Sequence, residues 1–555
     1  MRRWLVLLVA LSGCLSSTSP DTTDPDPSDP GVRDADLSDV GRWLAPFEGE
    51  VPAVNMVLLH DGRILYWSGV EAREGTVAEQ TFFTSSPHEG ESRILDLSGP
   101  SPVVTTPIHP GGAAGDLFCS GQTILADGRV LTAGGTAWKN VTDLDRFFLD
   151  GTGDARIFDP ATDTWTQVAD MTLGRWYPSL LTLPDGTPIA ASGIGDLTDF
   201  EEHWDSWESY DLAADRWDLM PDTLGHLLPL YPRLHIVPEG AMAGDVFYST
   251  AGTLWGPFGE HPQQAEWSTM QSHSHDGWHE HGRSTFGARQ YASSVLLPGG
   301  DGDPRVVSFG GSLQQGLLAT PFTEIIDLGT EPTTRRGPDM AFPRWNHNSL
   351  LLPDGDVLTI GGGLYDNVMI HGQQNVPVLE AERFDADTET WHTLAPMSVP
   401  RMYHSSAVLL PDGRILAGGH VPLPNPDPTL RDTVNEQVVE TRLEIYEPGY
   451  LFRGPRPVIE DAPHALGYGE VFRVDVRSEA AIDSVMLMRP GATTHAYDSN
   501  MRATWLEVVE QNGDTLTLRA PATADMTAPG HHMLFVNSEH PEGPVPSEAT
   551  WLHLS

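Results

Sequence analysis

The sequence predicts an all-β protein in which a seven-bladed β-propeller is followed by a smaller β-sandwich. Three observations favour this class: a hairpin pattern that recurs seven times, turn glycines at regular spacing, and a change of pattern after about residue 452. The 55 Gly and 46 Pro residues favour many short strands joined by tight turns over long helices. A chain of 555 residues is expected to form more than one domain.

The recurring unit is an apolar run, a polar turn that ends in Gly, a second apolar run and further glycine. Each unit predicts a hairpin of two strands. The seven units span residues 55–69, 121–135, 177–193, 231–252, 291–311, 346–363 and 403–420. Their turn glycines lie roughly 54 to 66 residues apart, at Gly62, Gly128, Gly186, Gly240, Gly300, Gly355 and Gly413. The spacing is close to the kelch period of about 50 residues and predicts a kelch-type propeller, whereas an array of sandwiches would not require such regularity.

Weaker segments between the hairpins, such as "ARIFDPATDTWTQ" (155–167), predict the outer two strands of each four-stranded sheet. The apolar stretch "GRWLAPF" (41–47) precedes the first hairpin. We expect it to supply the outermost strand of the last blade and so to close the ring, which leaves few open sheet edges. The propeller is therefore predicted to cover residues 40–452.

The pattern changes in residues 453–555. Segments such as "GEVFRVDV" and "DTLTLRAP" alternate apolar and polar residues, with turn signals about ten residues apart. This spacing is typical of an immunoglobulin-like sandwich of about 100 residues.

The N-terminus predicts an export signal over residues 1–13, with a basic start, "MRRW", and an apolar run, "LVLLVAL". The following "LSGC" resembles the lipobox of bacterial lipoproteins, which implies lipidation at Cys14; an ordinary secretory peptide cut nearby is the alternative. Residues 14–39 are rich in Asp, Pro, Ser and Thr and are expected to form a disordered tether. Together these features predict an extracytoplasmic protein anchored by lipid to a bacterial membrane.

The formal net charge is -45, and Lys139 is the only lysine. Nucleic acids and anionic membrane surfaces both require basic protein surface. The charge therefore argues against a nucleic-acid partner and against direct binding to a membrane surface.

Apart from Cys14, the sequence has one cysteine, Cys119, in "GDLFCSG" (115–121). If the chain is exported, this thiol has no disulfide partner, so either a special use or burial as a small apolar side chain must account for it. Three later segments, "GRWYPS" (174–179), "RMYHSS" (401–406) and "TTHAYDSNMR" (493–502), also carry chemistry-bearing residues. In this order along residues 40–555, the four segments resemble the active-site segments of the galactose oxidase/glyoxal oxidase family of copper radical oxidases.

The resemblance implies one copper ion and a thioether between Cys119 and Tyr177, whose oxygen would bind copper and store a radical. It also implies that Tyr403 is the axial tyrosine and general base, and that His404 and His495 supply two imidazoles. Two imidazole nitrogens and two tyrosine oxygens form a donor set suited to Cu(II). Adjacent residues on a regular strand point to opposite faces, so Tyr403 and His404 can share a metal only at the twisted start of a strand. The alternative is rim packing for these two residues and an ordinary loop histidine for His495.

The sequence departs from galactose oxidase where that enzyme stacks a Trp on the cross-linked Tyr, because the corresponding position is Gly195. The shield is therefore expected to be absent or to come from elsewhere, with Trp204 and Trp207 as candidates. "RWY" is closer to glyoxal oxidase and favours small aldehydes or simple primary alcohols over galactose. Candidate substrate-facing residues are Arg233, Asn346 and His347; structural rim positions are the alternative.

The segment "SHSHDGWHEH" carries four histidines within residues 273–281. It could bind a metal adventitiously, but we expect a solvated loop without preformed geometry. The favoured function is oxidation of an aldehyde or primary alcohol by O2 with release of hydrogen peroxide. The alternative is a non-catalytic propeller that binds surface glycan or protein, and a hydrolase lacks a visible pair of nucleophile and base.

Overall fold

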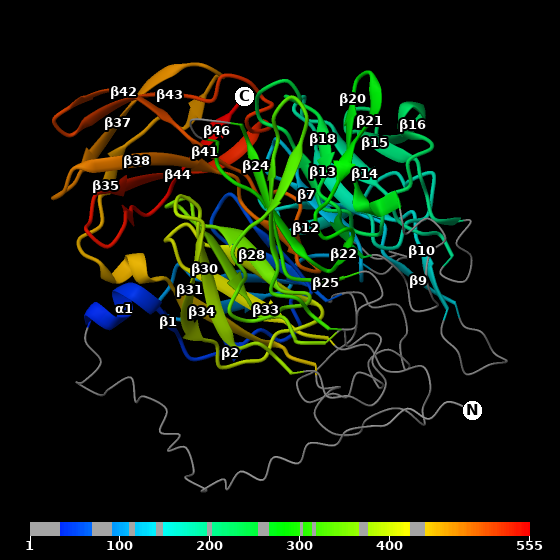
Figure 1. The fold of residues 1–555 in the computed structure, drawn as a ribbon, viewed down its shortest axis with the longest axis horizontal. Helices are drawn as coiled ribbons and strands as arrows, with labels where there is room; N and C mark the ends of the chain where they lie inside the picture. Colours follow the sequence, from blue (N-terminus) through cyan, green and yellow to red (C-terminus); the bar gives the residue numbers. More distant parts are fainter. Residues whose placement is uncertain are drawn as a thin grey trace, which may run out of the picture.

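The fold is given by a computed structural model, which describes residues 34–68, 92–109, 117–139, 148–196, 202–253, 266–299, 303–313, 318–365, 376–421 and 439–555 (Figure 1). Cys14 and the predicted export signal lie outside the described residues. In the described part of the chain, no helix has both the length and the apolar character needed to cross a membrane.

Antiparallel sheets form the blades of the predicted propeller, and each runs from an inner to an outer strand in chain order. Blade 1 contains β3 (Asn55–Leu58), β4 (Ile64–Trp67), β5 (Ser92–Asp96) and β6 (Val103–Thr105). Blade 2 contains β7 (Gly121–Ile124), β8 (Val130–Ala133), β11 (Ala155–Asp159) and β12 (Thr164–Gln167). Blade 3 contains β13 (Ser179–Thr182), β14 (Pro188–Ala191), β15 (Trp207–Asp211) and β16 (Arg216–Met220).

Blade 4 contains β17 (Leu234–Ile236), β18 (Val246–Tyr248), β20 (Thr269–Ser274) and β21 (Gly277–Arg283). Blade 5 contains β23 (Ser293–Leu296), β24 (Arg305–Phe309), β26 (Thr323–Asp327) and β27 (Thr333–Arg336). Blade 6 contains β28 (Asn348–Leu351), β29 (Val357–Ile360), β30 (Glu380–Asp385) and β31 (Thr390–Pro396). Blade 7 contains β32 (Ser405–Leu409), β33 (Ile415–Gly419) and β34 (Arg442–Glu447).

Short elements decorate the blades. A hairpin is formed by β9 (Thr136–Lys139) and β10 (Phe148–Gly151), and a small sheet by β19 (Ala251–Gly252), β22 (Arg289–Gln290) and β25 (Ser312–Leu313). The single-turn helices are η2 (Pro221–Thr223), η3 (Glu266–Ser268) and η4 (Gly449–Phe452).

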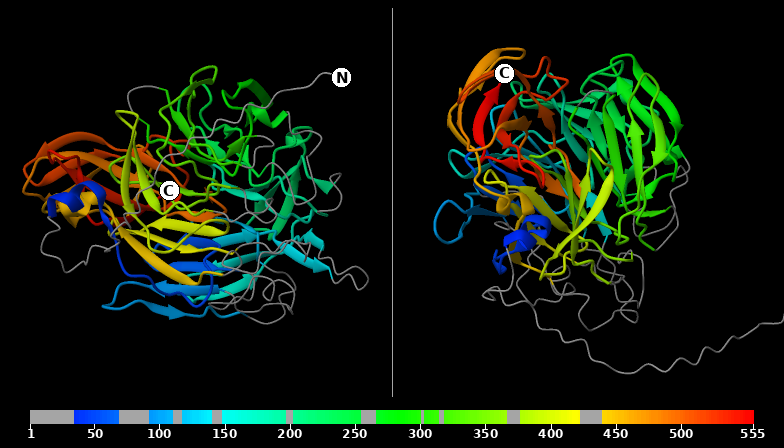
Figure 2. Two further views of the ribbon diagram at one scale, coloured as in Figure 1. Left: turned by 60° about the horizontal axis from the view of Figure 1, so that its bottom comes forward. Right: turned by 60° about the vertical axis from the view of Figure 1, so that its left-hand side comes forward.

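The ring is closed by the N-terminal segment, as the sequence predicts. Strands β1 (Arg42–Trp43) and β2 (Phe47–Glu48) pair with β34 and complete blade 7 from the outside. The inner strands β3 and β32 lie in contact, so the first and last blades are neighbours, and their blue and yellow strands lie side by side in Figure 2. Pairing the two ends of the propeller removes an edge that another chain could otherwise extend.

The inner hairpins turn where the repeated glycines predict. Six of the seven turn glycines are described, and all have φ between 84° and 91°. This left-handed conformation costs a glycine little, which explains why each hairpin turn ends in Gly. Gly300 lies outside the described residues.

One part of the predicted tether is ordered instead. Helix α1 (Asp34–Val40) packs against η4, so the disordered prediction is wrong for residues 34–39. The backbone of Ser38 approaches Gly449 so closely that a Cβ there would lie 2.2 Å from the Ser38 carbonyl oxygen. The close approach of the two backbones explains why this short polar segment holds a helix.

The C-terminal region is a sandwich of two sheets, shown in orange and red in Figure 1. One sheet contains β35 (Val458–Asp461), β37 (Val471–Arg477), β43 (Thr515–Arg519) and β42 (Glu507–Asn512). The other contains β36 (Ala465–Leu466), β46 (Thr550–Leu554), β44 (Gly530–Ser538), β38 (Ile482–Met488) and β41 (Ala503–Trp505), with β45 (Val545–Pro546) paired to β44. Every second residue of β37 is buried, which is the period expected of a strand with one face toward a core.

The sandwich also shares a core with the propeller. Met486, Met488, Met533 and Phe535 belong to the same buried cluster as inner-strand leucines of blades 6 and 7. Separation of the two domains would therefore expose apolar surface on both.

A hairpin from the C-terminal region enters the propeller. It consists of β39 (Ala492–Thr494) and β40 (Tyr497–Asp498), and β39 pairs with the inner strand β3 of blade 1. Thr493 donates a hydrogen bond to the carbonyl oxygen of Ala407 in blade 7 at 2.9 Å. The tip of this hairpin is thereby held at the centre of the ring.

Buried ion pairs brace three blades. Arg175 pairs with Glu208 at 3.0 Å in blade 3, and Arg344 pairs with Glu382 at 2.8 Å in blade 6; all four side chains are fully buried. Arg289 and Glu324 occupy the same positions in blade 5 at 3.6 Å. Each arginine precedes the start of an inner strand, so these pairs tie the head of that strand to the third strand of its blade.

Replacing Arg344 by Leu should destabilise the protein strongly. The change leaves the Glu382 carboxylate buried without its partner and also removes the bonds from Arg344 to the carbonyl oxygens of Gly361 and Glu380. Loss of one member of a buried pair costs about 3–5 kcal/mol of the free energy of unfolding. Denaturant unfolding followed by tryptophan fluorescence measures the loss. Arg477→Leu, which breaks an exposed pair with Glu460, is the control and should unfold like the parent; equal midpoints for both variants would contradict the role of the buried pair.

Candidate metal centre

The heads of six inner strands share an unusual backbone conformation. Cys119, Tyr177, Tyr231, Tyr291, Asn346 and His404 all have φ between 42° and 65°. Each lies one to three residues before the inner strand of blades 2 to 7, respectively. A non-glycine residue rarely adopts this left-handed region, and clusters of such strain occur at functional sites. We call these six residues the axial ring.

Backbone hydrogen bonds link several members of the axial ring from blade to blade. The amide of Tyr177 donates to the Cys119 carbonyl oxygen at 3.3 Å, and the amide of Tyr231 donates to the Tyr177 carbonyl oxygen at 2.9 Å. The amide of Asn346 donates to the Tyr291 carbonyl oxygen at 3.3 Å. These bonds offset part of the cost of the left-handed conformation and fix where each side chain begins.

The four residues predicted as metal ligands come together at the axis. The hydroxyl groups of Tyr177 and Tyr403 are hydrogen-bonded to each other. The Tyr177 oxygen lies 3.5 Å from Nε2 of His404. His495, at the tip of the inserted hairpin, packs its ring edge-on against that of His404 with centroids 4.6 Å apart. Residues separated by up to 318 positions (Tyr177 to His495) thus form one buried cluster.

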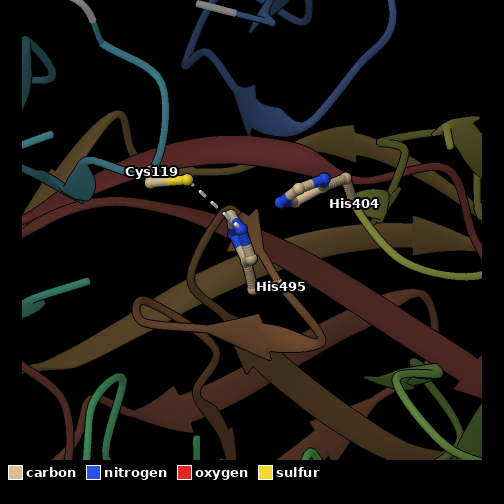
Figure 3. Close-up of side chains that lie close together, drawn as sticks. All are labelled: Cys119, His404 and His495. Atoms are coloured by element: carbon tan, nitrogen blue, oxygen red, sulfur yellow. Dashed lines mark hydrogen bonds between the residues drawn. The ribbon is translucent and has the colours of Figure 1, made fainter. Parts of the chain in front are cut away.

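Cys119 belongs to the same cluster. Its Sγ lies 3.9 Å from Nε2 of His495, and the three ligand atoms of Cys119, His404 and His495 all lie within 4.8 Å of one another (Figure 3). Cys119 and Tyr177 share one buried apolar cluster. In the described part of the chain, these three residues are the only group of His, Cys, Asp or Glu with such spacing.

Both imidazoles are oriented through Nδ1. Nδ1 of His404 lies 2.6 Å from the Val421 carbonyl oxygen, and Nδ1 of His495 lies 2.7 Å from the Thr494 hydroxyl oxygen. A carbonyl oxygen accepts only, so Nδ1 of His404 carries the proton and Nε2 keeps a free lone pair. A hydrogen bond of this kind is the usual support of a metal-binding histidine.

Burial sets the charge state of the cluster. It lowers the pKa of His404 to about 3 and the pKa of His495 well below its ordinary value, so both rings are neutral and available as donors. It also raises the pKa of Tyr177 and of Tyr403 well above the ordinary tyrosine value, with smaller contributions from neighbouring thiol and phenol groups. A bound cation would oppose this shift, because its charge favours phenolate.

The donor set fits copper. Two neutral imidazole nitrogens and two phenol oxygens converge in a fully buried place, and the set contains no carboxylate. Cu(II) prefers such nitrogen and oxygen donors, whereas Ca²⁺ and Mg²⁺ prefer carboxylate and carbonyl oxygens. The sequence-based expectation that Tyr403 and His404 share a twisted strand start also agrees, since β32 begins directly after His404.

Trp176, which sequence analysis did not single out, stacks on Tyr177. The two rings lie parallel within 11°, with centroids 3.6 Å apart. Of the two candidates named from the sequence, Trp204 donates to the Gly174 carbonyl oxygen at 2.7 Å, and Trp207 packs against Trp278. In a regular strand, adjacent side chains such as those of Trp176 and Tyr177 point to opposite faces and do not stack. The left-handed backbone of Tyr177 breaks this alternation, so the sequence pattern did not predict the contact.

Arg233 contacts the turn that carries His495. Its side chain is fully buried, and among the described residues it donates to three backbone carbonyl oxygens, including that of His495 at 2.8 Å. Its guanidinium also lies 5.2 Å from the centroid of the Tyr497 ring in the same hairpin. These contacts favour the structural alternative, and the substrate-facing role of Arg233 stays a prediction.

Asn346 and His347 share one feature: among the described residues, both polar side-chain atoms of each are buried without a hydrogen-bonding partner. Such groups are candidates for contact with a bound molecule. Asn346 is a member of the axial ring, whereas His347 packs against Gly310 and Gly362, at the contact between blades 5 and 6. The substrate-facing role of both residues stays a prediction.

The histidine-rich segment is a hairpin rather than a loop. His273, His279 and His281 lie on β20 and β21, the outer strands of blade 4, and His275 lies in the turn between them. His273 is buried beside Asp222, with Nε2 and Oδ2 3.5 Å apart. Among the described residues, none of the four belongs to a group with metal-like spacing.

Comparisons with known proteins identify families and relatives that this chain resembles. Residues 326–450 match the family described as glyoxal oxidase N-terminus, and residues 456–554 match the galactose oxidase-like early set domain. A galactose oxidase of Gibberella zeae is 25% identical over 93% of this chain and 71% of its own length. Aldehyde oxidase GLOX of Vitis pseudoreticulata is 28% identical over 83% of this chain and 85% of its own length.

A solved structure supports the fold. The structure titled "Novel fungal alcohol oxidase with catalytic diversity among the AA5 family, in complex with copper" superimposes with a TM-score of 0.70. The alignment covers 93% of this chain and all of that chain, at 21% sequence identity. The two chains therefore share the propeller and the appended sandwich.

Substitution of His495 by Ala should weaken Cu(II) binding by more than 100-fold. Loss of a supporting residue outside the ligand set typically costs about 10- to 100-fold in affinity, so loss of a ligand should cost more. Competition against a chelator of known affinity measures the change. The control is His532→Ala, which removes a buried C-terminal histidine that contacts Thr527 instead of the centre. Unchanged affinity in the His495 variant would show that this histidine is not a ligand. The single substitution is preferable to removal of residues 453–555, which would expose the shared core.

Proposed function

We propose that this chain is a member of the galactose oxidase and glyoxal oxidase family and oxidises a small aldehyde, as its hydrate, or a simple primary alcohol with O2. The enzyme class, a copper-dependent oxidase, follows from the family. The observation that carries the proposal is the buried convergence of two tyrosine oxygens, two imidazoles and one thiol at the propeller axis. A non-catalytic propeller that binds glycan or protein has no need of such a set.

The ligands of copper in this proposal are the phenol oxygens of Tyr177 and Tyr403 and Nε2 of His404 and of His495. Bound copper supplies a one-electron couple and a Lewis acid for the substrate oxygen. Each oxidation removes two electrons and two protons from the substrate, so a second one-electron carrier is required. Tyr177 serves as that carrier, and O2 takes up both electrons and both protons to leave as hydrogen peroxide.

Cys119 and Tyr177 together form the proposed carrier of the second electron. In the mature protein, a bond forms between Cys119 Sγ and an ortho carbon of Tyr177. The thiol hydrogen and the ring hydrogen leave, and the two electrons and two protons reduce O2 to hydrogen peroxide. A sulfur substituent makes the phenol easier to oxidise, and the indole of Trp176 covers one face of the ring.

Tyr403 is the proposed general base. Its oxygen faces Tyr177, and its ring lies against that of His404 with centroids 3.7 Å apart. As a phenolate it takes the hydroxyl proton of the substrate, a role worth about 10²–10⁴ in rate. Asn346, whose side-chain amide has no hydrogen-bonding partner among the described residues, is proposed to contact the substrate.

Anchoring by lipid at Cys14 and an extracytoplasmic location stay predictions of the sequence. The motif "LSGC" and the apolar run before it support them. Cys14 lies outside the described residues.

Maturation with copper and O2 should join Cys119 to Tyr177. The intact mass should fall by about two hydrogen masses, and Cys119 should resist alkylation in the denatured protein. Cys119→Ser provides the control, because it keeps a small buried side chain that cannot form the thioether. A Cys119 that is freely alkylated after maturation would refute the cross-link.

Tyr403→Phe should retain copper and nearly abolish turnover. Tyr177, His404 and His495 remain as ligands, and the radical on linked Tyr177 should keep its long-wavelength absorption. Peroxide release, assayed against a panel of aldehydes and alcohols, should fall by about 10²–10⁴. Full activity in Tyr403→Phe would refute the assignment of Tyr403 as the general base. If the parent protein binds copper but releases no peroxide with any substrate, the non-catalytic binding protein becomes the favoured alternative.

A further inference from the structure

Tyr291 touches the axial tyrosine with its hydroxyl group. It is the member of the axial ring contributed by blade 5, and its side chain is buried. The Tyr291 hydroxyl lies 3.4 Å from the Tyr403 oxygen, and the two rings meet edge to face. Sequence analysis assigned no role to this residue.

The Tyr403 oxygen has two hydrogen-bonding partners in the described part of the chain, the hydroxyl groups of Tyr177 and Tyr291. Tyr177 is itself a proposed ligand, so its oxygen is committed to the same centre as the oxygen of Tyr403. Tyr291 is outside the proposed ligand set. Its hydroxyl is therefore the contact that can direct the Tyr403 oxygen without competing for the metal.

Tyr291 is held firmly enough to direct a neighbour. Its amide donates to the Gly252 carbonyl oxygen at 2.9 Å, and its ring packs edge-on against Trp345 with centroids 4.8 Å apart. Two residues earlier, Arg289 donates to the Phe322 carbonyl oxygen at 3.0 Å and lies beside the buried Glu324. These contacts leave the Tyr291 hydroxyl little freedom to move away from Tyr403.

We infer that Tyr291 is a positioning residue that orients the Tyr403 oxygen for proton transfer from the substrate through this hydroxyl contact. The inference rests on the proposed function of Tyr403. A misplacement of about 1 Å at a reacting group can cost 10²-fold in rate, which sets the scale of the effect. Tyr291 acts through Tyr403 and not on the substrate, so its removal should lower kcat and leave KM nearly unchanged.

The test compares Tyr291→Phe with Tyr248→Phe in copper-loaded full-length protein. Tyr248 is also fully buried, and its hydroxyl donates to the Trp267 carbonyl oxygen at 3.2 Å, away from the axial ring. Three quantities are measured: the Cu(II) dissociation constant, the phenolate-to-Cu(II) absorption band, and kcat and KM for the best substrate of the panel. Tyr291→Phe should bind copper like the parent, shift the absorption band and lose about 10- to 100-fold in kcat. Tyr248→Phe should match the parent in all three.

A double variant separates positioning from general packing. If Tyr291 acts through Tyr403, adding Tyr291→Phe to Tyr403→Phe should cause no further loss of kcat, whereas independent effects would multiply. Multiplying effects, or a Tyr291→Phe protein with the parent's band and kcat, would overturn the inference. A parent that shows neither a phenolate band nor peroxide release would instead overturn the proposed function, and the inference with it.

Discussion

The pairing of β39 with β3 is the constraint on which the centre depends. Blade 1 contributes no residue to the axial ring, and the hairpin that extends its inner strand brings His495 to the axis instead. Groups from three blades hold the hairpin. The Arg233 side chain donates to the His495 carbonyl oxygen, and the backbone carbonyl oxygens of Ala407 and Gln122 accept from the hydroxyl groups of Thr493 and of Ser499, which follows β40. The propeller and the sandwich are therefore incomplete without each other, both in their shared core and in the set of donors.

The axial ring directs side chains to the propeller axis, which the regular part of a strand cannot do. Strands in a propeller run along the axis with side chains directed into the sheet interfaces, so a side chain reaches the centre only where a strand begins. The left-handed residue at each head provides that change of direction, and in blades 3, 5 and 6 a buried arginine two positions earlier ties the head to the third strand of its blade. The cost of six strained residues, of order 1–3 kcal/mol each, is met by the size of the cores that surround them.

Features that are local or repeated could be predicted from the sequence. The hairpin repeat predicts the blades, and residues 41–47 predict the closing strand that β1 and β2 provide. Short motifs also single out Cys119, Tyr177, Tyr403, His404 and His495, which the fold brings together. Other contacts were beyond such reasoning. Trp176 stacks on its sequence neighbour Tyr177, against the expected alternation of strands, and Tyr291 meets a residue 112 positions away. Arg233 contacts a hairpin that comes from the C-terminal region.

The electrostatics of the centre explain why its donors are phenols and imidazoles. Of the many acidic side chains in a chain of net charge -45, none belongs to the donor set. Burial keeps the two imidazoles neutral and the two phenols protonated, so these four donors carry no net charge before a metal binds. Two carboxylates in the same place would carry charge into a low-dielectric interior before any cation arrived, at a cost of several kcal/mol per ion. Phenols avoid that cost because they lose their protons only as the cation binds, and the arrangement is thus stable both before and after the metal enters.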